Sequence, residues 1–322
     1  MSTDPTPTSA DAPKPEESPK NFLDKLGAAL PIALTALATV FASMSNGALQ
    51  EAMYWKSQAA QDQSRSTNQW SLAGFKRDRA LIMQATAAQL RATSGYAEPR
   101  FDPPKDVSGP EAEKALAWLN EPKPEKGGLP AVKLPEVEDE TIKHLREAIE
   151  KREPERDLLK LAGRVPLAKI TKAIDDAEKY TEQVDKEWKP TMKVATAWVT
   201  GQLAFKRDDP DAAKKATNAT AAQASGFELE ERRYRAESQL NQGIAFLYEI
   251  RTKVSAAESD KFRKKSDYLS YAMLVAQIGA VASSLALARK QKSALWLFAA
   301  MIGVVAIGVG GYALIPPTML MF

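Results

Sequence analysis

The side chains that most often carry chemistry are scarce in this sequence. His144 is the only histidine, and Glu140 lies four residues before it, on the same face of a predicted helix over residues 138–153. Such a pair could form a carboxylate–imidazole couple or half of a metal site. Because the chain has no cysteine and no second histidine to complete a site, we interpret His144 as an exposed helix position beside a solvated charge.

Paired carboxylates are the other candidates for acid–base chemistry. The pairs are Asp175 with Asp176, Asp208 with Asp209, and Glu230 with Glu231. We interpret them as solvated helix faces or helix starts. Triad catalysis would need the same lone histidine, and no Gly-rich phosphate loop follows a strand. We therefore predict that the protein is not an enzyme and has no catalytic residue, cofactor or metal.

The charges of the chain are unevenly distributed. The sequence has 322 residues with 44 Lys and Arg against 41 Asp and Glu, a net charge of +3 that is too small to favour nucleic acid. Apart from the N-terminal tail, almost all charges lie between Glu51 and Asp267. Without cysteine, neither a disulfide nor a thiolate metal site can form.

Three long uncharged segments predict transmembrane helices. They are Leu26–Gln50, Tyr268–Ala288 and Ser293–Phe322, and a bilayer core needs about 20 helical residues. The basic turn between the last two contains Arg289, Lys290 and Lys292, which we expect at the lipid surface together with Trp296. A cleaved signal peptide is the alternative for the first segment. That segment is longer than the usual apolar region of about 7–15 residues, and its basic flank is weak.

Prolines mark the ends of two long predicted helices. Ser18 and Pro19 are typical of a helix start, and between them and Pro99 only Pro31 interrupts the chain. Asp209 and Pro210 start a second helix, with no further proline until Pro316. The predicted parts are a disordered tail (1–18), a first transmembrane helix (19–46), a stalk helix (47–94), a distal helical domain with Pro-rich connectors (95–209), a return stalk helix (210–266), a second transmembrane helix (267–288) and a third (293–315).

An apolar seam marks the distal domain. Its residues alternate in spacings of three and four, which is typical of packing between helices, and they are Leu167, Ile170, Ile174, Ala177, Val184 and Trp188. No strand pattern occurs outside the membrane segments. The predicted fold is therefore an all-α membrane protein with three transmembrane helices, two of which continue into a long coiled-coil-like stalk with a distal helical domain.

Small residues recur at helical spacing in the second and third spans. Such residues let helices approach closely in lipid, and the predicted oligomerisation positions are Gly279, Ser283, Ala299, Gly303, Ala306 and Gly310. The face with Gly303 and Gly310 could meet the second span of its own chain or a neighbouring subunit. No charged residue lies within a span, which weighs against active transport but leaves open a hydrophobically gated pore.

The layout resembles a family of bacterial membrane proteins, domain-of-unknown-function family 4337 (DUF 4337). The resemblance rests on Gln69-Trp70 and Lys76 after the first span and on Leu295-Trp296 after the basic turn of the terminal hairpin. It covers roughly 26–92 and 235–315, and it does not cover 95–210. It implies an integral membrane protein with no known reaction.

Three classes of function stay open from the sequence. The one we predict is a membrane-anchored, self-associating scaffold or interaction protein. Its partners would be the lipid bilayer, further copies of the chain and an unidentified protein at the distal domain. The alternatives are a channel or tension-sensing pore, and an enzyme subunit whose site a partner supplies.

We expect the bacterial cytoplasmic membrane as the location. Lys and Arg near the membrane ends number six on each side, so the positive-inside rule does not decide the orientation. The cluster Lys261–Lys265 and the acidic tail favour the cytoplasmic side for the large domain.

Overall fold

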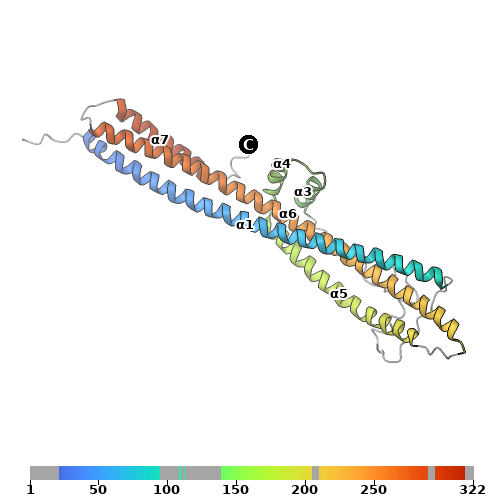
Figure 1. Ribbon diagram of the computed structural model, residues 1–322. Helices are drawn as coiled ribbons and strands as arrows, with labels where there is room; N and C mark the ends of the chain where they lie inside the picture. The colour runs from blue at the N-terminus through green and yellow to red at the C-terminus, as the bar shows by residue number, and fades with distance from the viewer. Residues whose placement is uncertain are drawn as a thin grey trace, which may run out of the picture. The chain divides into compact units, whose positions relative to one another are not determined.

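The computed structural model describes residues 22–94, 139–204, 210–288 and 294–315, together with Gly109 and Glu113. These residues form helices and no strand (Figure 1). The helices are α1 (Phe22–Thr93), α3 (Glu140–Glu150), α4 (Glu155–Ala162), α5 (Leu167–Leu203), α6 (Ala212–Ala288) and α7 (Ala294–Leu314). The prediction of an all-α fold is confirmed for this part of the chain. The predicted tail, the basic turn and most of 95–138 lie outside the described residues.

Three helices are long and apolar enough to cross a membrane, namely α1, α6 and α7. α1 continues as one helix through Pro31, where the Thr35 hydroxyl donates a hydrogen bond to the Pro31 carbonyl (2.8 Å). α5 likewise runs through Pro190. α3 and α6 begin and end within about three residues of the predicted bounds, close to the usual uncertainty of helix ends.

The chain divides into two compact units. Unit 1 comprises Met1–Ala52 and Asp260–Phe322, and unit 2 comprises Met53–Ser259. α7 therefore belongs to unit 1, and α3, α4 and α5 belong to unit 2, whereas α1 and α6 contribute residues to both.

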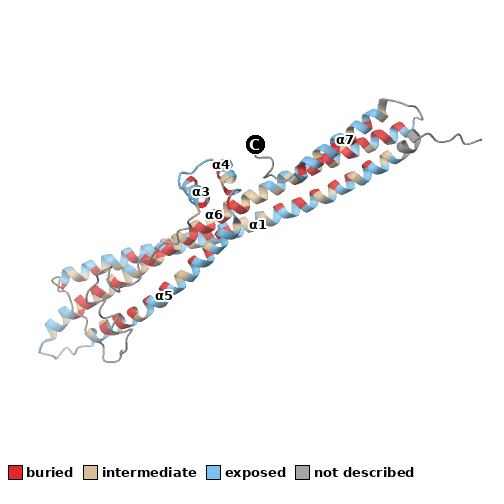
Figure 2. Cartoon of the chain, turned by 180° about the vertical axis from the view of Figure 1, so that it is seen from behind, coloured by how far each residue is buried: buried red, intermediate tan, exposed pale blue. Residues whose placement is uncertain are grey.

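Unit 1 is a bundle of α1, α6 and α7 whose interior holds mainly small side chains. Its buried residues recur along one side of each helix (Figure 2). They are Ala38, Phe41, Leu269, Ala272, Ala276, Ala306 and Ala313. Because most of these side chains are alanine, the helix axes can approach closely.

The large apolar side chains of unit 1 point outward instead. Ile32 is 72% exposed, Leu297 71% and Val304 70%, and Val281 on α6 is 61% exposed. A helical bundle in water turns such side chains into its core. The reversed distribution is what a bilayer requires, since lipid tails are as apolar as these side chains.

Unit 2 has a conventional apolar core that α5 and α6 share. One cluster joins Trp188 and Trp198 of α5 to Leu229 and Leu240 of α6. A second cluster adds the short helices, because Leu145 of α3 and Leu158 of α4 pack with residues of α5 and α6. The amphipathic short helices thus bury one face each and expose the other.

Asp139 fixes the start of α3 and ties it to α5. Its carboxylate accepts a hydrogen bond from the Thr141 backbone N–H (2.9 Å), and the Lys169 ammonium donates to the other oxygen (2.5 Å). The Lys169 contact and the hydrogen bonds from Thr141 hold the pKa of Asp139 well below its usual range. The carboxylate therefore stays charged, as an N-cap at the positive end of a helix favours.

Substitution of Ile174 tests the core of unit 2. Ile174 is 1% exposed, so Ile174→Asp would bury an uncompensated charge and lower the free energy of unfolding of unit 2 by roughly 3–5 kcal/mol. Thermal unfolding in detergent measures the effect. Lys172→Asp, at an exposed position of the same helix, is the control and should unfold like the wild type. Unchanged unfolding of Ile174→Asp would contradict the burial of this residue.

Candidate functional site

The residues with catalytic or metal-binding potential are dispersed in the described structure. His144 is exposed on α3, and Glu140 forms an ion pair with Lys143 (3.3 Å). Asp175 and Asp176 are exposed on α5. Within the described residues, no group of three or more His, Asp or Glu side chains could hold a metal ion. Asp208 and Asp209 lie outside the described residues.

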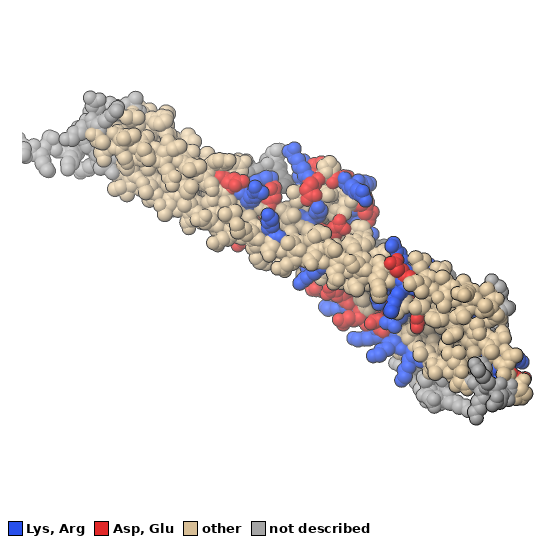
Figure 3. Space-filling view, viewed as in Figure 1, with Lys and Arg blue, Asp and Glu red and all other residues tan. Residues whose placement is uncertain are grey.

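Charged side chains cover the two units unequally. In the view of Figure 3, Lys, Arg, Asp and Glu gather over α3, α4 and α5, and the visible described surface of unit 1 is largely uncharged. Glu231, from the third predicted carboxylate pair, forms an ion pair with Arg235 one turn later on α6 (2.5 Å). The candidate functional surfaces are therefore the uncharged bundle of unit 1 and the contacts between helices in unit 2.

Glycines set the distances between the helices of unit 1. A Cβ atom added at Gly310 would lie 2.3 Å from the Phe41 ring, and one at Gly303 would lie 3.1 Å from Leu34. A Cβ atom at Gly279 would lie 2.9 Å from Ile302. A side chain at Gly310 or Gly279 would force a neighbouring side chain to move, and one at Gly303 would press on Leu34, so these glycines allow α1, α6 and α7 to pack together.

The six predicted oligomerisation positions all face the interior of this bundle. Ser283, Ala299 and Ala306 are each 0% exposed, and the three glycines contact neighbouring helices as described above. The structure places neither of the two predicted neighbours, α6 or a second subunit, against the face with Gly303 and Gly310. The neighbour is α1, a helix that the sequence alone did not single out. Self-association through these positions stays a prediction, and the observed contacts use this face within one chain.

A cluster of serines joins α1 to α6 in unit 1. The Ser45 hydroxyl lies within hydrogen-bonding distance of the Ser266 carbonyl (3.0 Å) and of the Ser270 hydroxyl (2.8 Å). In return, the Ser266 hydroxyl donates to the Ser45 carbonyl (3.0 Å). These reciprocal bonds fix the relative register of the two antiparallel helices.

Aromatic side chains lie near the ends of the uncharged parts of α6 and α7. The rings of Tyr268 and Tyr312 are in edge-to-face contact, with centroids 5.3 Å apart. Tyr271, three residues after Tyr268, is 60% exposed. Trp296, predicted to lie at the lipid surface, is half-buried near the start of α7. Its predicted companions Arg289, Lys290 and Lys292 lie outside the described residues. Tyrosine and tryptophan are enriched where membranes meet water.

The predicted seam residues lie in the core of unit 2. Ile170, Ile174, Ala177, Val184 and Trp188 are buried, and Leu167 is partly buried at the edge of the same core. They pack with residues of α6, and the N-terminal part of the seam, Ile170, Ile174 and Ala177, also packs with α3 and α4. The seam therefore serves packing within the chain.

The most buried charges of unit 2 were missed by sequence reasoning. Asp62 of α1 is 0% exposed and accepts two hydrogen bonds from Arg251 of α6, at 2.6 and 3.0 Å. The Gln58 amide donates a longer bond to the same carboxylate (3.3 Å). The Arg251 guanidinium also lies over the Tyr248 ring, 4.9 Å from its centroid. Both oxygens of the buried carboxylate therefore accept hydrogen bonds from the guanidinium.

Tyr248 extends this network to α5. Its hydroxyl donates a hydrogen bond to Glu178 (2.8 Å). Burial and the bond to this carboxylate raise the pKa of Tyr248, so the hydroxyl remains a donor. The network thus connects α1, α6 and α5 through polar contacts.

Small residues at intervals of seven bring α1 and α6 together in unit 2. Along α1 these buried residues are Ser66, Ala73, Ala80, Ala87 and Ser94. Ser66 donates to the Ala245 carbonyl (3.1 Å), and Ser238 of α6 donates to the Ala73 carbonyl (2.8 Å). The interval of seven was a readable sequence signal, but alanine and serine carry too little hydrophobicity to stand out.

Ion pairs extend the contact between α1 and α6. Arg91 contacts both oxygens of Glu228 at 3.0 Å and donates to the Ser225 hydroxyl (2.8 Å). Lys76 pairs with Glu237. Trp70 contacts Phe246 of α6 edge-to-face at 5.1 Å. Trp70 and Lys76, on which the family resemblance rests, therefore serve contacts between helices.

No family model matches the chain, and no curated protein or solved structure matches it. The resemblance to DUF 4337 accordingly stays a prediction.

The buried pair in unit 2 leads to a stability prediction. Asp62→Leu would leave the Arg251 charge buried and unpaired, and we expect it to lower the free energy of unfolding by roughly 3–5 kcal/mol. The double variant Asp62→Leu/Arg251→Met removes both charges and should regain most of this loss. Glu150→Gln breaks the exposed pair with Arg146 and should change stability by less than about 1 kcal/mol. Losses that simply add in the double variant would disprove the coupling.

Two glycines of α7, one facing the bundle interior and one facing outward, give a matched test of unit 1. Gly310→Leu would collide with Phe41, whereas Gly308 has nothing within 4 Å of an added Cβ atom. We expect Gly310→Leu to lower the thermal unfolding temperature in detergent and Gly308→Leu to leave it unchanged. Adding Phe41→Ala to Gly310→Leu should restore part of the loss. Equal behaviour of the two single variants would argue against the described packing.

Proposed function

We propose that the protein is a membrane-anchored, self-associating helical scaffold or interaction protein, with three spans formed by α1, α6 and α7. The observation that carries this proposal is the reversed packing of unit 1. Alanine and glycine fill its interior, and its surface exposes side chains such as Ile32, Leu297 and Val304. Exposure of so much contiguous apolar surface to water would be unfavourable, whereas in a bilayer it costs nothing.

The interior of unit 1 favours a scaffold over a pore through one chain. The described interior consists mainly of alanines and glycines with Leu34, Phe41, Leu269 and serines, and the serine hydroxyls are bonded to neighbouring helices or to their own. A water-filled path would need a polar lining. Self-association then supplies the assembly on which a scaffold depends.

Unit 2 supports the proposed role in protein interaction. Phe75, Leu81 and Ile82 of α1 are 56%, 55% and 60% exposed. Arg77 and Asp78, which are exposed on the same stretch of α1, argue for water as the surroundings of these side chains. Exposed apolar side chains in such a setting are typical of a surface that binds protein.

We place the protein in the bacterial cytoplasmic membrane with unit 2 in the cytoplasm. Arg263 and Lys264 are exposed on α6, a few residues before the uncharged segment that begins at Tyr268. The numbers of basic residues on the two sides are equal, and the density of the cluster Lys261–Lys265 together with the acidic N-terminal tail favours the cytoplasmic side for unit 2. The bacterial assignment rests on the family resemblance.

Labelling of single cysteines tests the membrane topology. The chain has no native cysteine, so Ser2→Cys and Glu150→Cys each introduce one reactive thiol. With one span between them, a membrane-impermeant maleimide should label Ser2→Cys and not Glu150→Cys in intact cells. Both should label after permeabilisation, and the protein should resist extraction by alkaline carbonate. Labelling of both positions in intact cells, or recovery in the soluble fraction, would refute the proposed topology.

A further inference from the structure

The second span carries one amide that its surroundings in unit 1 do not satisfy. Gln277 of α6 is exposed, and its side chain forms no hydrogen bond to any residue that the structure describes. It lies ten residues after Asp267 and eleven before Ala288, the last residue of α6, or roughly 15–17 Å from each at 1.5 Å per residue. Those distances place the amide near the middle of a bilayer core about 30 Å thick.

The neighbouring outward side chains on α6 show how unusual Gln277 is. Leu274, Ile278 and Val281 are 49%, 57% and 61% exposed and suit lipid. Ser284 is also exposed, but its hydroxyl donates to the Ala280 carbonyl of its own helix (2.8 Å). Gln277 has no such partner among the described residues. A polar group without a hydrogen bond is costly in hydrocarbon, so Gln277 requires a partner from outside the bundle.

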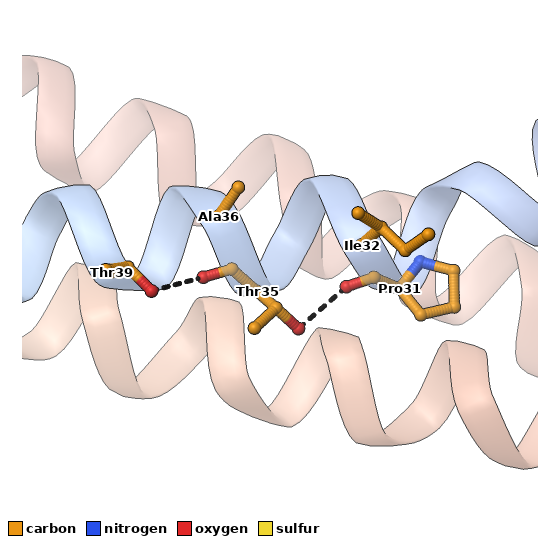
Figure 4. A pocket seen from close by; sticks show the side chains of 5 residues that line it. All are labelled: Pro31, Ile32, Thr35, Ala36 and Thr39. Carbon is orange, nitrogen blue, oxygen red and sulfur yellow. Dashed lines mark hydrogen bonds between the residues drawn. The ribbon is translucent and has the colours of Figure 1, made fainter.

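A groove on the outward face of α1 lies at the same depth. Pro31, Ile32, Thr35, Ala36 and Thr39 line it, and Figure 4 shows the two threonines bonded along their own helix. Thr35 donates to the Pro31 carbonyl (2.8 Å), and Thr39 donates to the Thr35 carbonyl (3.0 Å). Each hydroxyl oxygen therefore keeps lone pairs that can accept a further hydrogen bond.

The register of α1 against α6 establishes this equal depth. Ser45 lies opposite Ser266 and Ser270, and Leu34 contacts the position of Gly279. In antiparallel helices this register places Gln277 level with Ala36, at the centre of the groove. Both features belong to unit 1 and face outward from it.

We propose that Gln277 of one copy of the protein inserts into the Pro31–Thr39 groove of a second copy. The amide N–H groups donate to the hydroxyl oxygens of Thr35 and Thr39, and a threonine hydroxyl can turn to donate to the amide oxygen. Hydrogen bonds of Gln and Thr between helices are an established means of association in membranes. This inference rests on the proposed self-association and names its interface.

A contact between Gln277 and the Pro31–Thr39 groove accounts for more polar groups of unit 1 than a contact between the Gln277 side chains of two copies. A twofold pairing would satisfy the amide but leave the free lone pairs of the Thr35 and Thr39 hydroxyls without a donor. Contact between the α6 face and the α1 groove uses both features in one interface. Such an interface is head-to-tail, so each copy offers one groove and one amide to its neighbours.

Disulfide cross-linking in membranes tests the interface with Gln277 left intact. Ile32→Cys in one tagged copy and Val281→Cys in a differently tagged copy lie at equal depth on the proposed contact surfaces, and both positions are exposed. On oxidation we expect a mixed dimer carrying both tags. The control pairs Ile32→Cys with Met301→Cys, which is 56% exposed on α7 and lies at a similar depth, and it should give no mixed dimer.

A second experiment removes the amide without harming insertion. Gln277→Leu is more soluble in lipid, so the monomer should fold as before. We expect the dissociation constant of the oligomer in liposomes to rise roughly 3- to 30-fold. Ser284→Ala removes an outward hydroxyl from the same helix and should leave association unchanged, because that hydroxyl is bonded within α6.

The outcomes separate this inference from the proposed function. Light scattering of the wild type in mild detergent measures the number of copies. An oligomer in which Ile32→Cys and Val281→Cys form no mixed disulfide, or that Gln277→Leu leaves unchanged, would overturn the groove interface while self-association stands. A monomeric wild type would overturn both. A mixed dimer that Gln277→Leu weakens would support both.

Discussion

Close approach of helix backbones is the constraint on which unit 1 depends. The Phe41 ring occupies the space that a side chain at position 310 would need, and Leu34 lies close to the space beside position 303. In lipid, burial of apolar area gives no net driving force, so association depends on dispersion contacts between well-fitted surfaces. Alanine and glycine at the helix contacts, with large side chains outside, are consistent with packing of this kind. The same sequence in water would expose the wrong face of each helix.

The contact between α1 and α6 in unit 2 uses small residues for a different purpose. Because Ser66 and Ser238 are small, their hydroxyls can reach the carbonyls of the opposite helix. Small side chains alone specify register poorly, since many alanine registers pack equally well. The Asp62–Arg251 pair resolves this ambiguity, because a shift of one helix by a single residue would leave both charges buried without partners. A buried ion pair adds little net stability, so register is the benefit that it offers here.

Much of the fold could be predicted from the sequence because its strongest signals are local. The absence of charge over more than twenty residues indicates a span, and the three-and-four spacing from Leu167 to Trp188 indicates a buried helix face. The partner of each face is not a local property. Gly303 and Gly310 face α1 because three helices meet, which no spacing within α7 could reveal. Asp62 likewise looks like any charge on an exposed helix until Arg251, almost two hundred residues later, is placed against it.

Polar side chains within the spans differ in whether their own helix can satisfy them. The hydroxyls of Thr35, Thr39 and Ser284 donate to a carbonyl one turn earlier, so each can face lipid at little cost. A glutamine amide has two donors and an acceptor on a longer stem, and its own helix offers no free N–H to that acceptor. Gln277 is therefore the outward residue of the second span whose exposure to lipid is most costly. In the proposed self-association, Gln277 would select the face of α6 that meets another copy, because the cost of its amide falls only when a partner supplies the missing bonds.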